Sequence, residues 1–67
     1  MTIIALKDGA AVVAKQYWLE GGKLQWTSES GEQKSLPVEK VDLYRTTSLN
    51  RERNVDFVLQ SHDAVEQ

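Results

Sequence analysis

Hydrophobic and polar residues alternate along the first half of the chain, and turn-forming dipeptides interrupt this alternation. Asp8-Gly9, Gly21-Gly22 and Ser30-Gly31 each separate two segments rich in Ile, Val, Trp, Tyr and Leu. Such dipeptides between alternating segments are typical of tight β-hairpins. The pattern predicts four antiparallel strands, near Thr2–Lys7, Ala10–Glu20, Lys23–Ser28 and Glu32–Leu36.

The first two turns also predict how the strands pair. A two-residue first turn places Ile4 opposite Val13, and a two-residue second turn places Tyr17 opposite Trp26. With these registers the apolar residues share one face, which only Lys15 interrupts with a stem that can extend to solvent. This predicted core face consists of Ile4, Leu6, Ala11, Val13, Tyr17, Leu19, Leu24 and Trp26.

The third hairpin requires a longer loop, because a two-residue turn directs Leu36 away from the apolar face. A three-residue loop over residues 29–31, with Gly31 in the left-handed conformation, pairs Leu36 with Leu24. Pro37 has no N–H to donate, so we expect it to end the fourth strand or to lie at an edge.

The spacing of apolar residues changes after the fourth strand. Val38 and Val41 suit a helical turn, and Asp42 is a candidate N-cap for a helix from about Leu43 to Arg53. Asn54 tolerates positive φ and is expected to end this helix. One side of the helix is predicted to carry Thr46, Leu49, Asn50 and Arg53.

The alternation of Val55, Phe57 and Leu59 with their neighbours predicts a short fifth strand that returns to the sheet and completes the core. Residues 1–59 are therefore expected to form a single small β-rich domain, and residues 60–67 a flexible C-terminal tail. The predicted class is mainly β (α+β), a four-stranded antiparallel meander with a short helix.

Composition limits the possible functions. A chain of 67 residues has room for one small domain and excludes a multidomain enzyme. Eight Lys and Arg against ten Asp and Glu give a net charge of −2, which disfavours nucleic-acid binding. Cysteine is absent, so disulfides and thiolate metal sites are excluded. No apolar run approaches the roughly 18 residues of a membrane span, so we expect no membrane insertion.

The residues do not predict catalytic chemistry. His62 is the single histidine and lies in Ser61-His62-Asp63, but successive residues of a tail do not converge as a catalytic triad must. One His without Cys leaves only carboxylates as metal ligands, and four scattered glycines make no phosphate-binding loop. We therefore expect no enzyme activity, no metal and no cofactor.

Trp18 is the most informative candidate for binding. It is predicted to project from the face opposite Tyr17 and Trp26, beside amides and small apolar residues such as Val12 and Ala14. A tryptophan in such a setting can anchor a protein partner. The alternative is that the helix, the last strand or closure of a barrel covers Trp18. The candidate binding residues are Trp18, Gln16, Gln25 and Thr27.

The basic residues concentrate in one part of the chain. They interleave with carboxylates, which favours a solvated, ion-paired surface, and Arg53 could instead tie down carbonyl or carboxylate groups. The alternative is a small-barrel nucleic-acid binder that uses Lys40, Arg45, Arg51 and Arg53.

Two segments carry a family resemblance: a YW-x-E-x-G hairpin from Tyr17 and a T-x-x-L-N-x-E-R-x-V-x-F segment from Thr46. From Leu6 to Leu59 the chain resembles a small C-terminal domain of uncharacterised bacterial proteins, although that family has Tyr at the position of Trp26. The resemblance implies an accessory module in a longer envelope or secreted protein, and it supplies no catalytic or binding residues. The meander, helix and last strand also resemble an SH3-like or partly open barrel.

These observations lead us to expect a non-catalytic interaction module. It would bind a protein segment, or associate with itself, through an edge strand or the face around Trp18. A structural oligomerisation domain that pairs its first or fourth strand with a neighbour is a further alternative.

Overall fold

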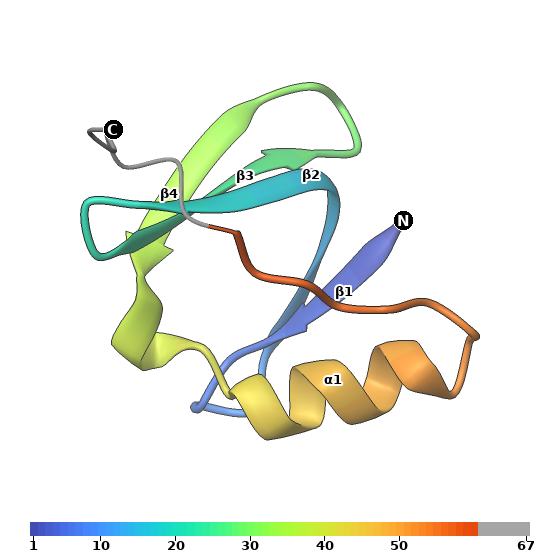
Figure 1. The fold of residues 1–67 in the computed structure, drawn as a ribbon. Coiled ribbons are helices and arrows are strands. Elements are labelled where there is room, and N and C mark those ends of the chain that lie inside the picture. The colour runs from blue at the N-terminus through green and yellow to red at the C-terminus, as the bar shows by residue number, and fades with distance from the viewer. Residues whose placement is uncertain (61–67) are drawn as a thin grey trace, which may run out of the picture.

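The structure is a computed structural model that describes residues 1–60. Four strands form one antiparallel meander in the order β1-β2-β3-β4, followed by a short 3-10 turn, η1 (Val38–Lys40), and one helix, α1 (Leu43–Arg51) (Figure 1). Because β1 and β4 remain the two edges, the sheet is not closed into a barrel. The strands are β1 (Thr2–Ala5), β2 (Ala11–Glu20), β3 (Lys23–Ser28) and β4 (Gln33–Pro37).

The second and third hairpins have the predicted registers. Tyr17 pairs with Trp26 across the Gly21-Gly22 turn, and both glycines have the positive φ of a two-residue hairpin. Leu24 pairs with Leu36, and the φ of Gly31 is +94°. These turns therefore determine the alignment of β2, β3 and β4.

The predicted register of the first hairpin is wrong by one residue. Ile4 pairs with Val12, not with Val13. The Leu6 N–H donates to the Ala10 carbonyl at 2.8 Å, so the loop has three residues and ends at Gly9 with a φ of +98°. A left-handed glycine completes this loop in the same way as Gly31 completes the third hairpin.

A β-bulge at Lys15 compensates for this shift. Ala14 pairs with Ser28 and Gln16 with Thr27, so Lys15 is an extra residue on β2. The bulge reverses the alternation of side chains and puts Ala14, not Val13, in the core. The expectation that Lys15 interrupts a continuous apolar face is therefore wrong, and Val13 is 37% exposed.

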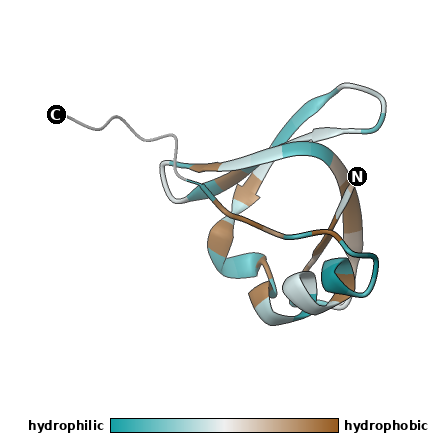
Figure 2. Ribbon diagram, turned by 45° about the vertical axis from the view of Figure 1, so that its right-hand side comes forward, coloured by the Kyte–Doolittle hydropathy of each residue, from teal (hydrophilic) through white to brown (hydrophobic). Residues whose placement is uncertain are grey.

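The hydrophobic core lies on the inner face of the sheet and includes Val41, which follows η1. Figure 2 shows hydrophobic residues along β1, the start of β2 and the segment after α1, whereas α1 itself is mostly neutral or hydrophilic. Contacts other than an apolar stripe must therefore hold the helix. The buried cluster consists of Ile4, Ala14, Leu24, Trp26 and Val41, with Leu6, Val12, Tyr17, Leu36 and Leu59 packed against it.

The helix begins and ends close to the predicted residues. Asp42 Oδ1 accepts a hydrogen bond from the Arg45 N–H at 3.0 Å, which confirms the N-cap. The helix ends at Arg51, two residues before the predicted Arg53, and Asn54 follows with a φ of +62°.

The predicted fifth strand over Val55–Leu59 is absent, because these residues have no regular secondary structure. The segment packs on the sheet instead. The Phe57 ring stacks on Tyr17 with centroids 5.1 Å apart, and the Leu19 N–H donates to the Gln60 carbonyl at 2.8 Å. The alternation thus serves side-chain packing without strand pairing. Residues 61–67 of the predicted tail lie outside the described residues.

Candidate interaction surfaces

The outer edge of β1 presents the backbone groups of Ile3 and Ala5. Leu6 and Ala10, which lie just beyond β1 and β2, form a hydrogen-bonded pair. Along two antiparallel strands, hydrogen-bonded pairs alternate with pairs whose backbone groups point away from the partner strand. The N–H and C=O groups of Ile3 and Ala5 therefore point away from the sheet, towards α1.

Asn50 satisfies both backbone groups of Ile3. Its Oδ1 accepts from the Ile3 N–H at 2.8 Å, and its Nδ2 donates to the Ile3 carbonyl at 2.7 Å. Nδ2 also donates to the Thr46 carbonyl at 2.6 Å, and the Asn50 side chain is fully buried. The amide thus replaces the peptide group of an adjacent strand.

Thr46 has the same function one helical turn earlier. Its Oγ1 accepts from the Ala5 N–H at 2.8 Å and donates to the Ala5 carbonyl at 3.4 Å. The Asp42 N–H also donates to that carbonyl at 2.8 Å. Thr46 is fully buried, so both inward-facing polar residues of α1 bind the edge of β1.

The two ends of this edge are also paired. The Lys7 N–H donates to the Lys40 carbonyl at 2.9 Å, and Arg53 Nη1 donates to the Met1 carbonyl at 3.2 Å. Arg53 therefore ties down a carbonyl, one of the two structural roles expected from the sequence. With Asn50 and Thr46, these contacts occupy the edge of β1, which leaves no place there for a further strand.

The outer edge of β4 has no such cover. The Ser28 N–H donates to the Glu32 carbonyl at 2.8 Å, so the alternation directs the backbone groups of Gln33 and Ser35 outward. No hydrogen bond from another residue of the described chain reaches these groups. Pro37 ends β4 as predicted, at a position where a missing N–H costs no ladder bond. We call the outward groups of Gln33 and Ser35 the β4 edge.

The predicted binding residues lie together on the outer face of the sheet. Trp18 pairs with Gln25, and Gln16 pairs with Thr27, so the four side chains form two adjacent cross-strand pairs. Trp18 is half-buried, and its Nε1 donates to Glu20 Oε1 at 3.0 Å. We call these four residues the Trp18 surface.

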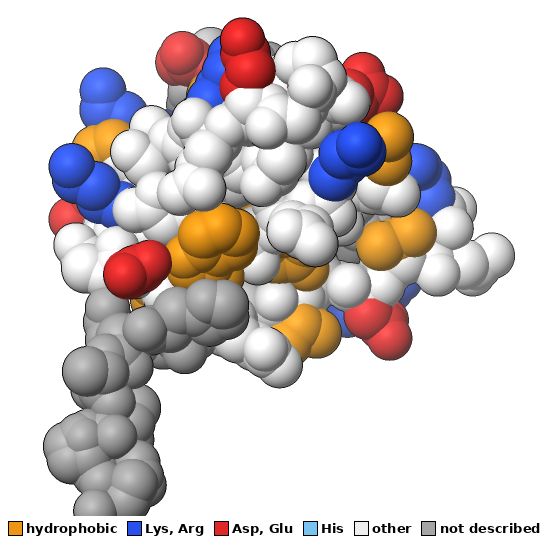
Figure 3. All heavy atoms as spheres, turned by 90° about the horizontal axis from the view of Figure 1, so that it is seen from above, with side chains coloured by type: hydrophobic (Ala, Val, Ile, Leu, Met, Phe, Trp, Pro, Cys, Tyr) orange, Lys and Arg blue, Asp and Glu red, His pale blue; other side chains and the backbone are white. Residues whose placement is uncertain are grey.

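The surroundings of the Trp18 surface differ from the prediction. The bulge moves Val12 and Ala14 to the inner face, and the uncharged residues Gln33 and Ser35 of β4 extend the outer face instead. Figure 3 shows the side of the molecule opposite α1, where uncharged and hydrophobic side chains occupy the middle and charged side chains lie towards the margins.

Two cavities lie next to the inward-facing side chains of β4. One, of about 450 Å³, lies between β4 and the loop that joins β1 to β2; we call it the Leu36 cavity. The other, of about 360 Å³, lies at the opposite end of β4; we call it the Lys34 cavity. The first is lined by Leu6, Lys7, Asp8, Leu36, Glu39 and Lys40, and the second by Val13, Trp26, Ser28, Glu29, Ser30, Glu32 and Lys34.

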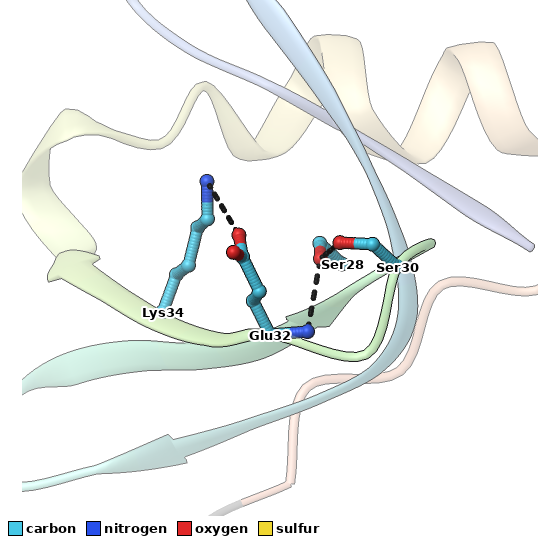
Figure 4. Close-up of polar contacts among 4 residues, drawn as sticks. All are labelled: Ser28, Ser30, Glu32 and Lys34. Carbon is cyan, nitrogen blue, oxygen red and sulfur yellow. Dashed lines mark hydrogen bonds and ion pairs between the residues drawn. The ribbon is translucent and has the colours of Figure 1, made fainter.

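The Lys34 cavity already holds a cation against an indole ring. Lys34 Nζ lies 5.7 Å from the centroid of the Trp26 ring and 3.7 Å from Glu32 Oε1. Figure 4 shows this ion pair beside Ser28, whose Oγ accepts from the Glu32 N–H at 3.2 Å. Trp26 is 7% exposed, and its Nε1 has no hydrogen-bond partner in the described chain. Sequence reasoning treated Trp26 as core alone, although the third-hairpin register places Lys34 directly opposite it.

The four candidate basic residues do not share one surface of α1. Arg45 and Arg51 are six residues apart, which separates them by about 120° around a helix of 3.6 residues per turn. Lys40 precedes the helix, and Arg53 follows it with its guanidinium bound to the Met1 carbonyl next to β1.

Within residues 1–60, no three His, Cys, Asp or Glu side chains form a group that could hold a metal ion. The string Ser61-His62-Asp63 falls beyond the described residues. Over the same range, no helix has the length and apolar character needed to cross a membrane.

No protein-family model, curated protein or solved structure matches the chain, so the family resemblance stays a prediction.

Proposed function

We propose that this chain is a non-catalytic interaction module that binds an extended protein segment along the β4 edge. The observation that supports the proposal is the difference between the two edges of the sheet. Polar groups from α1 and its preceding turn occupy the edge of β1, whereas the β4 edge has no partner in the described chain. Unpaired edge groups are the template for strand addition, in which backbone hydrogen bonds provide affinity.

The residues of β4 favour a foreign segment over a second copy of this chain. In an antiparallel pair centred on Lys34, the two Lys34 ammonium groups would face each other and repel. A pair centred on Ser35 would place Gln33 opposite Pro37, which has no N–H to donate. Lys and Pro are typical of edges that resist self-pairing, so oligomerisation is the less supported alternative.

The Trp18 surface is a second candidate site. Its support is the direct pairing of Trp18 with Gln25 and of Gln16 with Thr27. Trp18 is partly exposed, and its Nε1 donates a hydrogen bond to Glu20 Oε1 at 3.0 Å. A partly exposed tryptophan among uncharged amides can anchor a partner, since tryptophan is enriched at binding hot spots.

Nucleic-acid binding by Lys40, Arg45, Arg51 and Arg53 has weaker support, because these cations are dispersed and the chain carries a net charge of −2. A binding titration with single-stranded RNA at two salt concentrations tests it. Steep loss of affinity at high salt would favour this alternative.

The proposal can be tested with a phage-displayed random dodecapeptide library selected on the immobilised chain. Selected peptides are expected to shift the amide resonances of Gln33 and Ser35 most strongly in NMR titrations. Ser35→Pro removes one outward N–H and should lower affinity at least tenfold, while Trp18→Ala should change it less than threefold. Equal binding to wild type and Ser35→Pro would contradict the proposal, and dependence on Trp18 would instead favour the Trp18 surface.

A further inference from the structure

The inward-facing side chains of β4 would lie directly opposite two residues of an added strand. Lys34 and Leu36 are two residues apart, so they project from the same face of β4. The Val38 N–H donates to the Gly22 carbonyl at 3.2 Å, which makes this a hydrogen-bonded pair. Because such pairs alternate, the backbone groups of Leu36 and Lys34 also face β3. Opposite an added strand, both residues would therefore form non-hydrogen-bonded pairs, in which the two side chains lie closest.

From this geometry, and resting on the proposed function, we infer that the β4 edge selects a segment with an apolar residue opposite Leu36 and no basic residue opposite Lys34. The three strand pairs of this sheet are antiparallel. In an antiparallel addition, the partner residue opposite Leu36 comes two positions before the one opposite Lys34. The partner sequence is then an apolar residue, any residue, and a residue other than Lys or Arg, and the apolar side chain enters the Leu36 cavity.

The apolar position follows from the walls and the size of the Leu36 cavity. Leu36 lines it from β4 and Leu6 lines it from the chain just after β1, and both are only partly buried. The walls are mostly apolar, since Lys and Glu can turn their stems to a cavity and their charges to solvent. The volume of about 450 Å³ lies within the range of about 300–1,000 Å³ that is typical of ligand pockets. An apolar partner side chain would cover these walls and remove them from water.

The short length of the β4 edge makes a side-chain anchor necessary. Ser35 is the last residue of β4 with both an outward N–H and an outward C=O, because Pro37 has no N–H. Beyond it, η1 leads the chain to Lys40, whose carbonyl accepts from the Lys7 N–H at 2.9 Å and joins the two sides of the cavity. A segment bound here gains few backbone hydrogen bonds. In strand addition, pockets for alternate side chains supply the specificity that such bonds lack.

The exclusion of a basic residue follows from Lys34. Its Nζ lies 5.7 Å from the centroid of the Trp26 ring and 3.7 Å from Glu32 Oε1, so this ammonium already occupies the place of a cation beside both groups. A partner Lys or Arg opposite Lys34 would bring a like charge into a close cross-strand pair, which is unfavourable. The side chain of Lys34 is 51% exposed, so salt screens part of the repulsion, and we expect reduced affinity without complete loss.

The same peptide selection tests the apolar position. Selected peptides should carry an apolar residue two positions before a residue that is rarely Lys or Arg. In a synthetic peptide with this motif, replacing the apolar residue by Ala should lower affinity about tenfold, because an anchor in a pocket carries much of the binding energy. Its side chain should give nuclear Overhauser effects to the methyl groups of both Leu36 and Leu6. Leu6 is decisive, because a strand that paired with β4 without entering the cavity would not approach it; Leu49 of α1 is the control and should give none.

The position opposite Lys34 is tested by exchanging charges. A synthetic peptide with Lys at this position should bind about fivefold more weakly than the same peptide with Gln. Lys34→Gln in the protein should abolish this difference, because it removes the like charge. Lys15→Gln removes an equal charge from the exposed bulge of β2, which lies on the far side of β3 from β4, and is the matched control. It should leave the fivefold difference intact.

The outcomes separate this inference from the proposed function. If Ser35→Pro abolishes binding but the peptides lack the apolar residue or give no contact with Leu6, the inferred anchor is wrong and strand addition stands. If Lys and Gln peptides bind equally to the wild type, or Lys34→Gln leaves their difference unchanged, the exclusion of basic residues is wrong and strand addition again stands. If Ser35→Pro has no effect, the inference and the proposed function both fail.

Discussion

The two edge strands of this small sheet differ in what happens to their outward-pointing N–H and C=O groups. The edge of β1 is covered by buried side chains of α1, with Asn50 and Thr46 in the place of a neighbouring strand. The edge of β4 is short and exposed, and it carries Lys34 and Pro37. An edge can therefore be protected either by satisfying its hydrogen bonds or by making its pairing unfavourable, and only the second leaves groups available to a partner.

The largest expected effect follows from removing the Asn50 amide. Asn50→Leu leaves the partly buried N–H and C=O of Ile3 without partners, and each unsatisfied buried group costs about 1–3 kcal/mol. We expect a loss of about 3 kcal/mol in the free energy of unfolding, measured by urea denaturation. Asn54→Gly, at the residue with positive φ after the helix, is the control and should leave stability unchanged or slightly higher. A loss below about 1 kcal/mol in Asn50→Leu would mean that the edge of β1 does not depend on this amide.

The second effect concerns the hydroxyl that binds Ala5. Thr46→Val keeps the shape of the side chain but removes the acceptor for the Ala5 N–H, so we expect a loss of about 2 kcal/mol. Thr47→Val removes a hydroxyl at the adjacent position and should change the unfolding free energy by less than about 0.5 kcal/mol. Thermal denaturation of both variants measures the difference, and equal losses would contradict a specific function for Thr46.

A proline scan of β4 should give a smaller but directional difference. The Lys34 N–H belongs to the ladder with β3, whereas the Ser35 N–H points outward. Lys34→Pro should therefore lower the free energy of unfolding by about 1.5 kcal/mol more than Ser35→Pro. This difference is the net contribution of one β3–β4 backbone hydrogen bond plus the backbone strain that proline adds within the ladder. If Ser35→Pro is the more damaging variant in urea denaturation, the assignment of inward and outward groups on β4 is reversed.

The smallest effect is expected at the end of the β1 edge. Arg53 is exposed, and its single bond to the Met1 carbonyl is 3.2 Å long, so Arg53→Ala should cost about 0.5 kcal/mol. Arg51→Ala removes an equal charge without a comparable contact and serves as the control. Identical melting temperatures would show that Arg53 adds nothing to this edge.

Local turn chemistry predicted much of the fold. The glycines of the second and third turns, Pro37 and the Asp42 cap act through their immediate neighbours, and the structure agrees with the predictions at each. The first hairpin could not be aligned in this way. Residues 10–14 are all Ala or Val, so every register buries apolar side chains, and the bulge at Lys15 leaves no signal of its own.

The candidate sites also differ in whether neighbouring residues or distant contacts form them. The four residues of the Trp18 surface were predicted together because one hairpin register relates them. The helix side with Thr46, Asn50 and Arg53 was also predicted, but its pairing with β1 was not. Asn50 and Ile3 are 47 residues apart, and only the folded chain brings an amide to a strand edge at that separation.

Amide hydrogen exchange of the isolated chain compares the two edges in one experiment. If α1 covers β1 and β4 is open, the Ile3 and Ala5 amides exchange as slowly as the ladder amides of β2 and β3, while the Gln33 and Ser35 amides exchange at nearly unfolded rates. Addition of a selected peptide should then slow exchange at Gln33 and Ser35 alone. Slow exchange at Gln33 and Ser35 in the isolated chain, or fast exchange at Ile3 and Ala5, would contradict the difference between the edges on which the proposed function rests.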